Sequence, residues 1–191
     1  LLTLPDSSGL LAQRMLREAK IVAQLEHPAI VPIHDVGTLA DGRIYYVMKF
    51  VSGVTLANYR KSVSALPELL RLFQKVVDAI AFVHAHHILH RDLTPANIMV
   101  GQFGEVLVLD WGLAAITGAK DDSMLVPNGD KPATIAPHPI TAAGAVMGTP
   151  AYISPEQASG DLSRVDQSSD IYSLGAILYY LLTAQHPSAS T

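Results

Sequence analysis

Apolar positions recur at helical spacing in three stretches of this chain. The first spans about residues 10–25 and ends before Pro28, which pushes the preceding residue out of helical geometry. The second spans about residues 67–84, where a proline suits the first turn and a wide apolar face follows. The third, residues 169–183, is apolar nearly all round, which is typical of a helix buried in a core. The pattern therefore predicts three helices, the last of them buried.

Shorter apolar runs separated by turn residues predict strands. Residues 30–34 and 43–51 are two candidates, with an Ala-Asp-Gly turn between them. Residues 98–100 and 106–109 are predicted to form a hairpin around a Gly-Gln-Phe-Gly turn. Residues 118–145 are rich in Pro, Gly, Ala, Asp and Thr, and this composition predicts a long mobile loop.

The predicted hairpin gathers oxygen-bearing side chains at one end. Asn97 precedes its first strand and Asp110 follows its second, so antiparallel pairing brings both to the same edge. Asp92 lies on the loop that enters the hairpin. Carboxylate and amide oxygens grouped in this way suit Mg²⁺ and substrate phosphates. A further carboxylate that does not bind the metal could orient a hydroxyl, and together these groups are the equipment for phosphoryl transfer.

Four motifs, in this order along the chain, resemble those of the protein kinase family. Residues 90–97 (HRDLTPAN) resemble the catalytic loop, and residues 110–112 (DWG) resemble the metal-binding D-F-G motif with Trp in place of Phe. Residues 148–152 (GTPAY) and 154–156 (SPE) resemble the end of the activation segment. Residues 170–175 (DIYSLG) resemble the start of the large central helix. The set resembles eukaryotic-like serine/threonine kinases, and its details resemble the bacterial members.

This resemblance implies an α+β, bilobal protein-kinase-like fold, truncated at both ends. Residues 1–50 would form a partial N-lobe from helix C onward, and residues 51–191 the hinge and most of a mainly helical C-lobe. Residues 110–156 would be the activation segment of this single kinase domain, residues 1–191. The Gly-rich loop and the strand lysine of the family are absent from these residues, so the fragment itself is expected to be inactive while its full-length parent transfers phosphate.

The resemblance also implies catalytic roles. Asp92 would be the base that accepts the proton of a substrate Ser or Thr hydroxyl, and Asn97 and Asp110 would bind Mg²⁺. Four further positions match family residues that support catalysis: Glu18, the helix C glutamate; Arg91, which binds an activation-loop phosphate; Thr94, at the position of a lysine that contacts the γ-phosphate; and Thr149, which steadies the catalytic aspartate. Thr141 is the first candidate phosphosite, ahead of Ser123 and Thr134.

Adenine and the framework of the site have their own matching positions. Met48 would be the gatekeeper, Lys49 to Val51 the hinge whose backbone holds adenine, and Met99 the apolar floor beneath it. Asp170 would be the buried acid that holds the backbone of the catalytic loop. Ile33, Val22, Trp111 and His90 would form a stacked column of side chains.

Composition narrows the function. The chain has 191 residues, 49% hydrophobic and 16% charged, which fits one globular domain. A net charge of −4 argues against general nucleic-acid binding, and zero cysteines exclude disulfides and thiolate metal sites. The longest apolar stretch, about residues 172–182, is shorter than the roughly 20 residues that cross a bilayer. We expect ATP and Mg²⁺ as cofactors, a protein substrate, no nucleic acid, no membrane contact from this segment and a cytoplasmic location. Dimerisation and membrane anchoring of a longer parent stay open.

Other interpretations compete with this one. Each acidic residue alone could be a turn or capping residue, and the histidines at 84, 86, 87 and 90 could suggest a metal site, which the catalytic-loop match disfavours. A pseudokinase that serves as a binding or scaffold module is the main alternative, because Thr94 replaces a cation of the family's site and the Gly-rich loop and strand lysine are missing from these residues. Pro95 and residues 148–150 resemble the serine/threonine branch and disfavour tyrosine specificity. Residues 148–156 resemble a peptide-docking element and disfavour small-molecule substrates.

Overall fold

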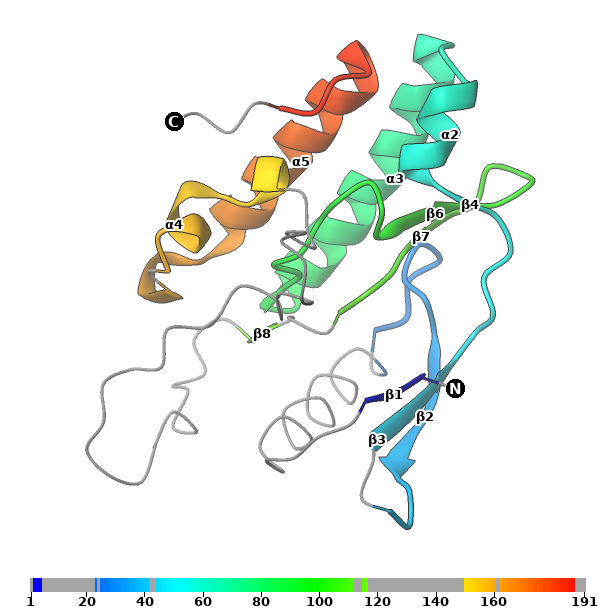
Figure 1. Ribbon diagram of the computed structural model, residues 1–191, viewed down its shortest axis with the longest axis vertical. Coiled ribbons are helices and arrows are strands. Elements are labelled where there is room, and N and C mark those ends of the chain that lie inside the picture. Colours follow the sequence, from blue (N-terminus) through cyan, green and yellow to red (C-terminus); the bar gives the residue numbers. More distant parts are fainter. Residues whose placement is uncertain are drawn as a thin grey trace, which may run out of the picture.

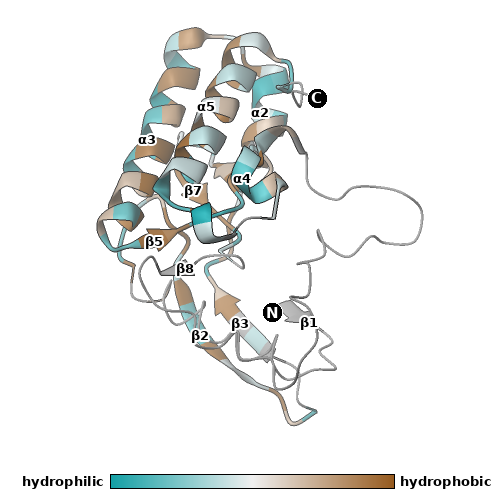
Figure 2. Cartoon of the chain, turned by 90° about the vertical axis from the view of Figure 1, so that its left-hand side faces the viewer, coloured by the Kyte–Doolittle hydropathy of each residue, from teal (hydrophilic) through white to brown (hydrophobic). Residues whose placement is uncertain are grey.

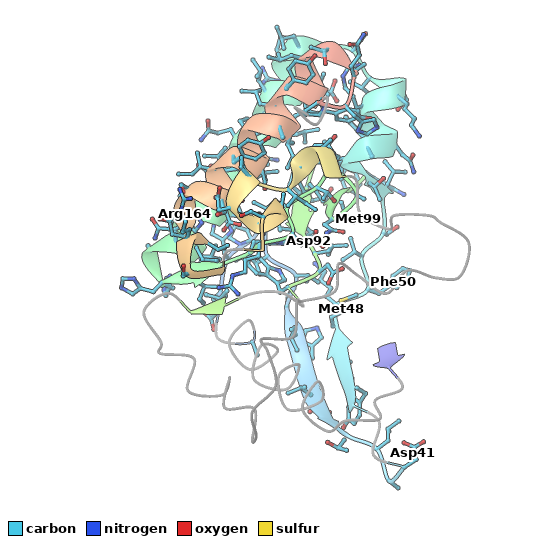
Figure 3. The ribbon with its side chains drawn as sticks, turned by 60° about the vertical axis from the view of Figure 1, so that its left-hand side comes forward. Asp41, Met48, Phe50, Asp92, Met99 and Arg164 are labelled. Carbon is cyan, nitrogen blue, oxygen red and sulfur yellow. The ribbon has the colours of Figure 1, made fainter. Side chains whose placement is uncertain are left out.

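The computed structural model describes residues 2–4, 23, 25–41, 44–111, 115–116, 150–160 and 162–187. A three-stranded antiparallel sheet lies at one end of the molecule and the long helices at the other (Figure 1). The sheet has the order β1-β3-β2 and consists of β1 (Leu2–Leu4), β2 (Ile33–Thr38) and β3 (Ile44–Met48). Asp41 lies at the far end of the β2–β3 hairpin (Figure 3).

Two smaller sheets lie against the helical part. One has the order β4-β6-β7, with β4 (Val54–Thr55), β6 (Ile98–Val100) and β7 (Val106–Val108). The other pairs β5 (Ile88–Leu89) with β8 (Ala115–Ile116). The helices are α2 (Leu56–Ser62), α3 (Leu66–Ala85), α4 (Pro155–Ala158) and α5 (Gln167–Thr183), with 3₁₀ turns at Pro150–Tyr152 and Leu162–Arg164.

The core forms where α3 packs against α5 and β7. The buried positions of α3 follow the helical period and face inward, whereas polar residues occupy its other side (Figure 2). They are Leu69, Leu72, Val76, Ala79, Ile80 and Val83. Ile177, Tyr180 and Leu181 of α5 join the same cluster. This core supports the loop between β5 and β6, where the candidate site lies.

The structure confirms the two helices predicted near residues 67–84 and 169–183 and the hairpin around residues 101–104. The strand predicted at residues 30–34 is present but its bounds are wrong, because β2 begins at Ile33 and continues to Thr38. Pro32 lacks the N–H that a strand position needs, and Ile30 instead forms an isolated parallel bridge to Val108. The pairing of β2 with β3 determines where β2 lies.

The third helix, α5, is buried along one side and not all round, so the burial that its apolar pattern predicts is only partly correct. Four large residues of α5 are exposed in the described part of the chain: Ile171, Tyr172, Tyr179 and Leu182. The helix packs on α3 and on the turn at Pro150–Tyr152, and these contacts cover one side of it. Within the residues that the structure describes, no helix is both long and apolar enough to span a membrane.

Two predicted segments fall almost wholly outside the described residues. They are the helix at residues 10–25 and the loop at residues 118–145. Of the first segment the structure describes only Ala23, in a turn, and Leu25, which is buried and outside any helix.

Candidate active site

The β6–β7 hairpin brings Asn97 and Asp110 to one end. Ile98 pairs with Val108, and the N–H of Leu109 donates to the carbonyl of Asn97 at 2.8 Å. Asp110 is the next residue; it is exposed and has φ 59°, a left-handed conformation that turns the chain out of the strand. The two residues therefore lie at the same end of the hairpin, as its predicted pairing requires.

The side chain of Asn97 contacts Asp92 directly. Its amide nitrogen donates to the backbone carbonyl of Asp92 at 2.8 Å and to the carboxylate oxygen Oδ2 at 3.0 Å. Because both partners can only accept, the amide orientation is fixed and Oδ1 of Asn97 faces away from Asp92. An amide oxygen and an exposed carboxylate at the same end of one hairpin are of the ligand types that suit a Mg²⁺ ion, which keeps most of its other ligands as water or phosphate oxygens. No group of three or more His, Asp or Glu side chains arranged to hold a metal occurs within the described ranges.

Asp170 holds the backbone just before Asp92. Its carboxylate accepts hydrogen bonds from the N–H of His90 at 2.9 Å and of Arg91 at 2.8 Å, and lies 2.8 Å from Nε2 of His84. The side chain is buried in the first turn of α5. Burial alone would raise the pKa of Asp170, but the hydrogen bonds from His84, His90 and Arg91 outweigh it and lower the pKa. A charged Asp170 therefore fixes the catalytic-loop backbone, the contact that the resemblance implied.

His90 links the loop of Asp92 to the residue before Asp110. Its Nδ1 accepts from the N–H of Asp92 at 3.3 Å, and its Nε2 lies 3.1 Å from the carbonyl of Leu109. Since a carbonyl only accepts, the proton sits on Nε2 and the neutral ring satisfies both partners. Burial lowers the pKa of His90, while the carboxylates of Asp170, Asp92 and Asp110 act in the opposite direction. One neutral imidazole thus contacts both the backbone of Asp92 and the residue before Asp110.

Trp111 packs on this support. Its ring lies 4.5 Å from the ring of His90, centroid to centroid, and its Nε1 donates to the carbonyl of Val108 at 3.3 Å. Trp111 is buried, so the aromatic residue after Asp110 fills an apolar space, as the D-F-G match implied. Of the predicted column, Ile33 is half-buried in β2 and Val22 lies outside the described residues.

The candidate adenine residues lie where the helical part meets β2 and β3, the region in which Figure 3 labels Met48, Met99 and Asp92. Met48 is the last residue of β3. Both Met48 and Val51 pack against the core. Lys49 is exposed, and its N–H donates to the carbonyl of Pro32 at 3.0 Å. Met99 is half-buried and sits between Thr55 and Leu107 in its sheet. Met48 therefore lies at the end of the β1-β3-β2 sheet and Met99 in the β4-β6-β7 sheet, with residues 49–53 connecting β3 to β4.

The remaining predicted residues divide into two groups. Thr94 shapes the loop, since its carbonyl accepts from the N–H of Asn97 at 3.0 Å. Arg91 has φ 69°, and its carbonyl accepts from the side chain of Gln157 at 2.7 Å. Outside the described residues lie Glu18, Thr149, Thr141, Ser123 and Thr134.

Sequence reasoning missed the contacts of His84 and Gln157. The sequence shows His84 only as one of four nearby histidines, and its contact with Asp170 joins residues 86 positions apart. Gln157 lies 66 positions from Arg91 in sequence, and no local pattern indicates their contact.

Known proteins resemble this chain along most of its length. The family model described as the protein kinase domain matches residues 5–191. A serine/threonine-protein kinase PknD of Chlamydia abortus is 40% identical over 195 residues, covering 95% of this chain and 20% of that protein. PknD of Protochlamydia amoebophila is 39% identical over 189 residues, covering 92% and 19%. PknD of Chlamydia trachomatis serovar D is 38% identical over 204 residues, covering 95% and 21%.

The chain spans about a fifth of the length of these curated relatives. The match covers the catalytic loop, the hairpin and the helix that carries Asp170, which are the elements that build the site. This chain therefore belongs to the protein kinase family and has the family's mixed α and β fold.

Proposed function

We propose that a full-length protein containing this domain transfers the γ-phosphoryl group of ATP to Ser or Thr hydroxyls of proteins. The observation that supports the proposal most strongly is the contact of the Asn97 amide with Asp92, at the hairpin end that also carries Asp110. Catalysis of this reaction depends mainly on positioning and charge neutralisation, and a cluster of fixed oxygen atoms can supply both. The bacterial relatives named as serine/threonine-protein kinases agree with the choice of acceptor.

Each residue has a proposed role. Asp92 accepts the proton of the substrate hydroxyl, and its contact with Asn97 holds the carboxylate in place. Asn97 and Asp110 bind Mg²⁺, which when bound neutralises charge on the phosphates. Thr94 shapes the turn before Asn97. Glu18, Arg91 and Thr149 keep the supporting roles that the family resemblance gives them.

Adenine is proposed to bind between Met48 and Met99, with the backbone of Lys49 and Val51 as its polar partners. We assign residues 1–50 to a partial N-lobe, residues 51–191 to the hinge and partial C-lobe, and residues 110–156 to the activation segment. ATP chemistry and a sequence without cysteine fit a cytoplasmic position for the domain. Dimerisation and membrane anchoring of a longer form stay predictions.

The test is Asp92→Asn in the full-length protein, assayed for transfer of labelled phosphate from ATP to a generic protein substrate. Loss of a general base lowers rates by about 10²–10⁴-fold, and a fall of this size is expected. Asp78→Asn is the matched control, because Asp78 lies exposed on α3 and accepts a local hydrogen bond from the side chain of Gln74 at 2.9 Å. Equal rates for the two variants would rule out the proposal.

A pseudokinase is the second candidate, and Thr94 favours it. A threonine supplies no cation to the γ-phosphate, and the loss of one such contact weakens transition-state stabilisation. ATP titrations of the full-length protein, with and without Mg²⁺, separate the two functions. Mg²⁺-dependent binding together with phosphate transfer supports the enzyme, whereas a protein that binds partners and shows neither supports the scaffold.

A further inference from the structure

Arg91, directly before Asp92, has an unusual backbone. Its φ of 69° lies in the left-handed region, which costs free energy for a residue with a Cβ atom. Such conformations persist where surrounding groups over-determine them, and they concentrate at functional sites. Among the described residues, two side chains form hydrogen bonds with its backbone: the Asp170 carboxylate accepts its N–H at 2.8 Å, and Nε2 of Gln157 donates to its carbonyl at 2.7 Å.

Gln157 is itself held in one orientation. Its Oε1 accepts from the N–H of Ser154 at 3.3 Å and from the Ser154 hydroxyl at 3.0 Å. A backbone N–H can only donate and the Arg91 carbonyl can only accept, so the amide fits in one way. Ser154 is completely buried and precedes α4, which makes it a rigid anchor for this side chain.

The helix that carries Gln157 is also fixed to α5. The hydroxyl of Ser169 donates to the carboxylate of Glu156, and this hydrogen bond lowers the pKa of Glu156. Ser169 is buried and precedes Asp170 in the chain. The two groups that hold the backbone of Arg91 therefore come from one connected unit, α4 together with the first turn of α5.

We propose that Gln157 is a positioning residue that couples the end of the activation segment to the catalytic aspartate through the Arg91 carbonyl. The inference rests on the proposed function and deepens it. Displacement of α4 would withdraw the amide donor, release the strained backbone at Arg91 and move the neighbouring Asp92. A well-placed α4 would keep Asp92 aligned with Asn97. This arrangement would make the rate depend on the state of the activation segment, residues 110–156.

The chemistry requires an amide at this position. Glutamate is nearly isosteric and keeps an oxygen for Ser154, but at neutral pH it turns a carboxylate oxygen toward the Arg91 carbonyl. A protonated glutamate has a hydroxyl that can donate to this carbonyl. Gln157→Glu should therefore behave as a defective variant at neutral pH and recover part of its function in acid.

The experiment compares wild type, Gln157→Glu and Ser159→Ala in the full-length protein. Ser159→Ala is the control, because Ser159 is the exposed residue that follows α4 and its hydroxyl donates to the Glu156 carbonyl rather than to Arg91. Loss of one hydrogen bond predicts a fall in kcat of about five- to tenfold for Q157E, with the KM for ATP unchanged. The ratio of Q157E to wild-type activity should rise from about pH 7.5 to about pH 5.5.

Hydrogen exchange of the peptide covering residues 88–97 gives a readout that does not depend on activity. Exchange should be about five- to tenfold faster in Q157E and unchanged in Ser159→Ala. If Q157E does not fold, Gln157→Met, uncharged and of similar length, replaces it. An inactive wild-type protein overturns the proposed function. The hydrogen-exchange comparison then still tests whether Gln157 positions the catalytic loop. Exchange in Q157E equal to that of wild type overturns the positioning role.

Discussion

The two ends of the β6–β7 hairpin are built from the same strands but are held in different ways. At the Asn97 end, side chains from α5 and α4 reach the neighbouring backbone, and His84 of α3 contacts the Asp170 carboxylate that holds it. At the turn end, contacts are few and exposed: Glu105 accepts from the N–H of Phe103 at 2.9 Å, and Lys75 donates to the carbonyl of Gly104 at 2.6 Å. Phe103 is 89% exposed.

Backbone strain separates the ends further. The turn end places a glycine at its left-handed position, Gly104 with φ 76°, where no Cβ atom is strained. The other end uses Arg91 and Asp110 at φ 69° and 59°. Polar contacts hold Arg91 on both sides, and the Leu109–Asn97 hydrogen bond anchors the residue before Asp110. Strained conformations of this kind concentrate at functional sites, which agrees with the function proposed for this end of the hairpin.

Asp170→Asn is expected to have the largest effect on stability. The substitution removes the charge that three donors share in a buried site, and the expected loss of unfolding free energy is about 2–4 kcal/mol. Chemical denaturation at neutral pH measures it. A loss below about 0.5 kcal/mol would contradict the claim that Asp170 fixes the catalytic loop.

His90→Phe should cost about 1–3 kcal/mol, because the ring still packs on Trp111 but both hydrogen bonds disappear. Burial lowers the pKa of His90 in the folded protein. As the pH falls, the unfolded chain is therefore protonated first, at about pH 6.5. The stability from His90 is complete above this pH and is lost as the pH falls through it toward the folded-state pKa.

Denaturation curves from about pH 7 to about pH 5.5 test this assignment. Wild-type stability should fall more steeply over that range than the stability of His90→Phe, which has no imidazole here to protonate. The carboxylates of Asp170, Asp92 and Asp110 face His90 and are present in both proteins. Parallel curves would show that a neutral His90 is not part of the support.

How much the sequence predicts differs between the elements. The periods of α3 and α5 and the turn of the hairpin are local signals, and they predicted these elements correctly. The short helix α2 was missed, because it buries only Leu56 and its main signal is the Thr55 side chain that accepts from the N–H of Asn58. The start of β2 could not be predicted, since its position depends on pairing with β3.

The site shows the same division. The meeting of Asn97 with Asp110 follows from hairpin pairing, which the sequence indicates. The contact of Gln157 with Arg91 depends on how α4 packs, and the two residues are 66 positions apart in the chain. The family resemblance predicted the Asp170 contact, because Asp170 matches a family position that holds the catalytic-loop backbone. No motif in the sequence assigned a role to Gln157.

Asp110→Gly separates function from stability at the strained end. Glycine removes the left-handed strain at this position but adds freedom to the unfolded chain, so stability should change by less than about 1 kcal/mol. Mg²⁺-dependent nucleotide binding should be lost together with the carboxylate. Thermal unfolding and ATP titration of the same protein measure both, and retained Mg²⁺ dependence would show that Asp110 is not a ligand.

Glu105→Gln is expected to have the smallest effect. Hydrogen bonds from its own N–H and from that of Phe103 lower the pKa of Glu105, but the group is exposed and the amide oxygen can still accept. The shift in Tm should stay below about 2 °C and activity should be unchanged. A large loss of activity would mean that the turn end also belongs to the site.

Calorimetric titration of ATP into the full-length protein, with and without Mg²⁺, tests the central claim most directly when Asp110→Asn is compared with Glu105→Gln. Both substitutions replace a carboxylate on the same hairpin, at opposite ends. The account predicts that Mg²⁺ strengthens ATP binding equally in wild type and Glu105→Gln, and that Asp110→Asn loses this strengthening. An undiminished Mg²⁺ effect in Asp110→Asn would contradict it.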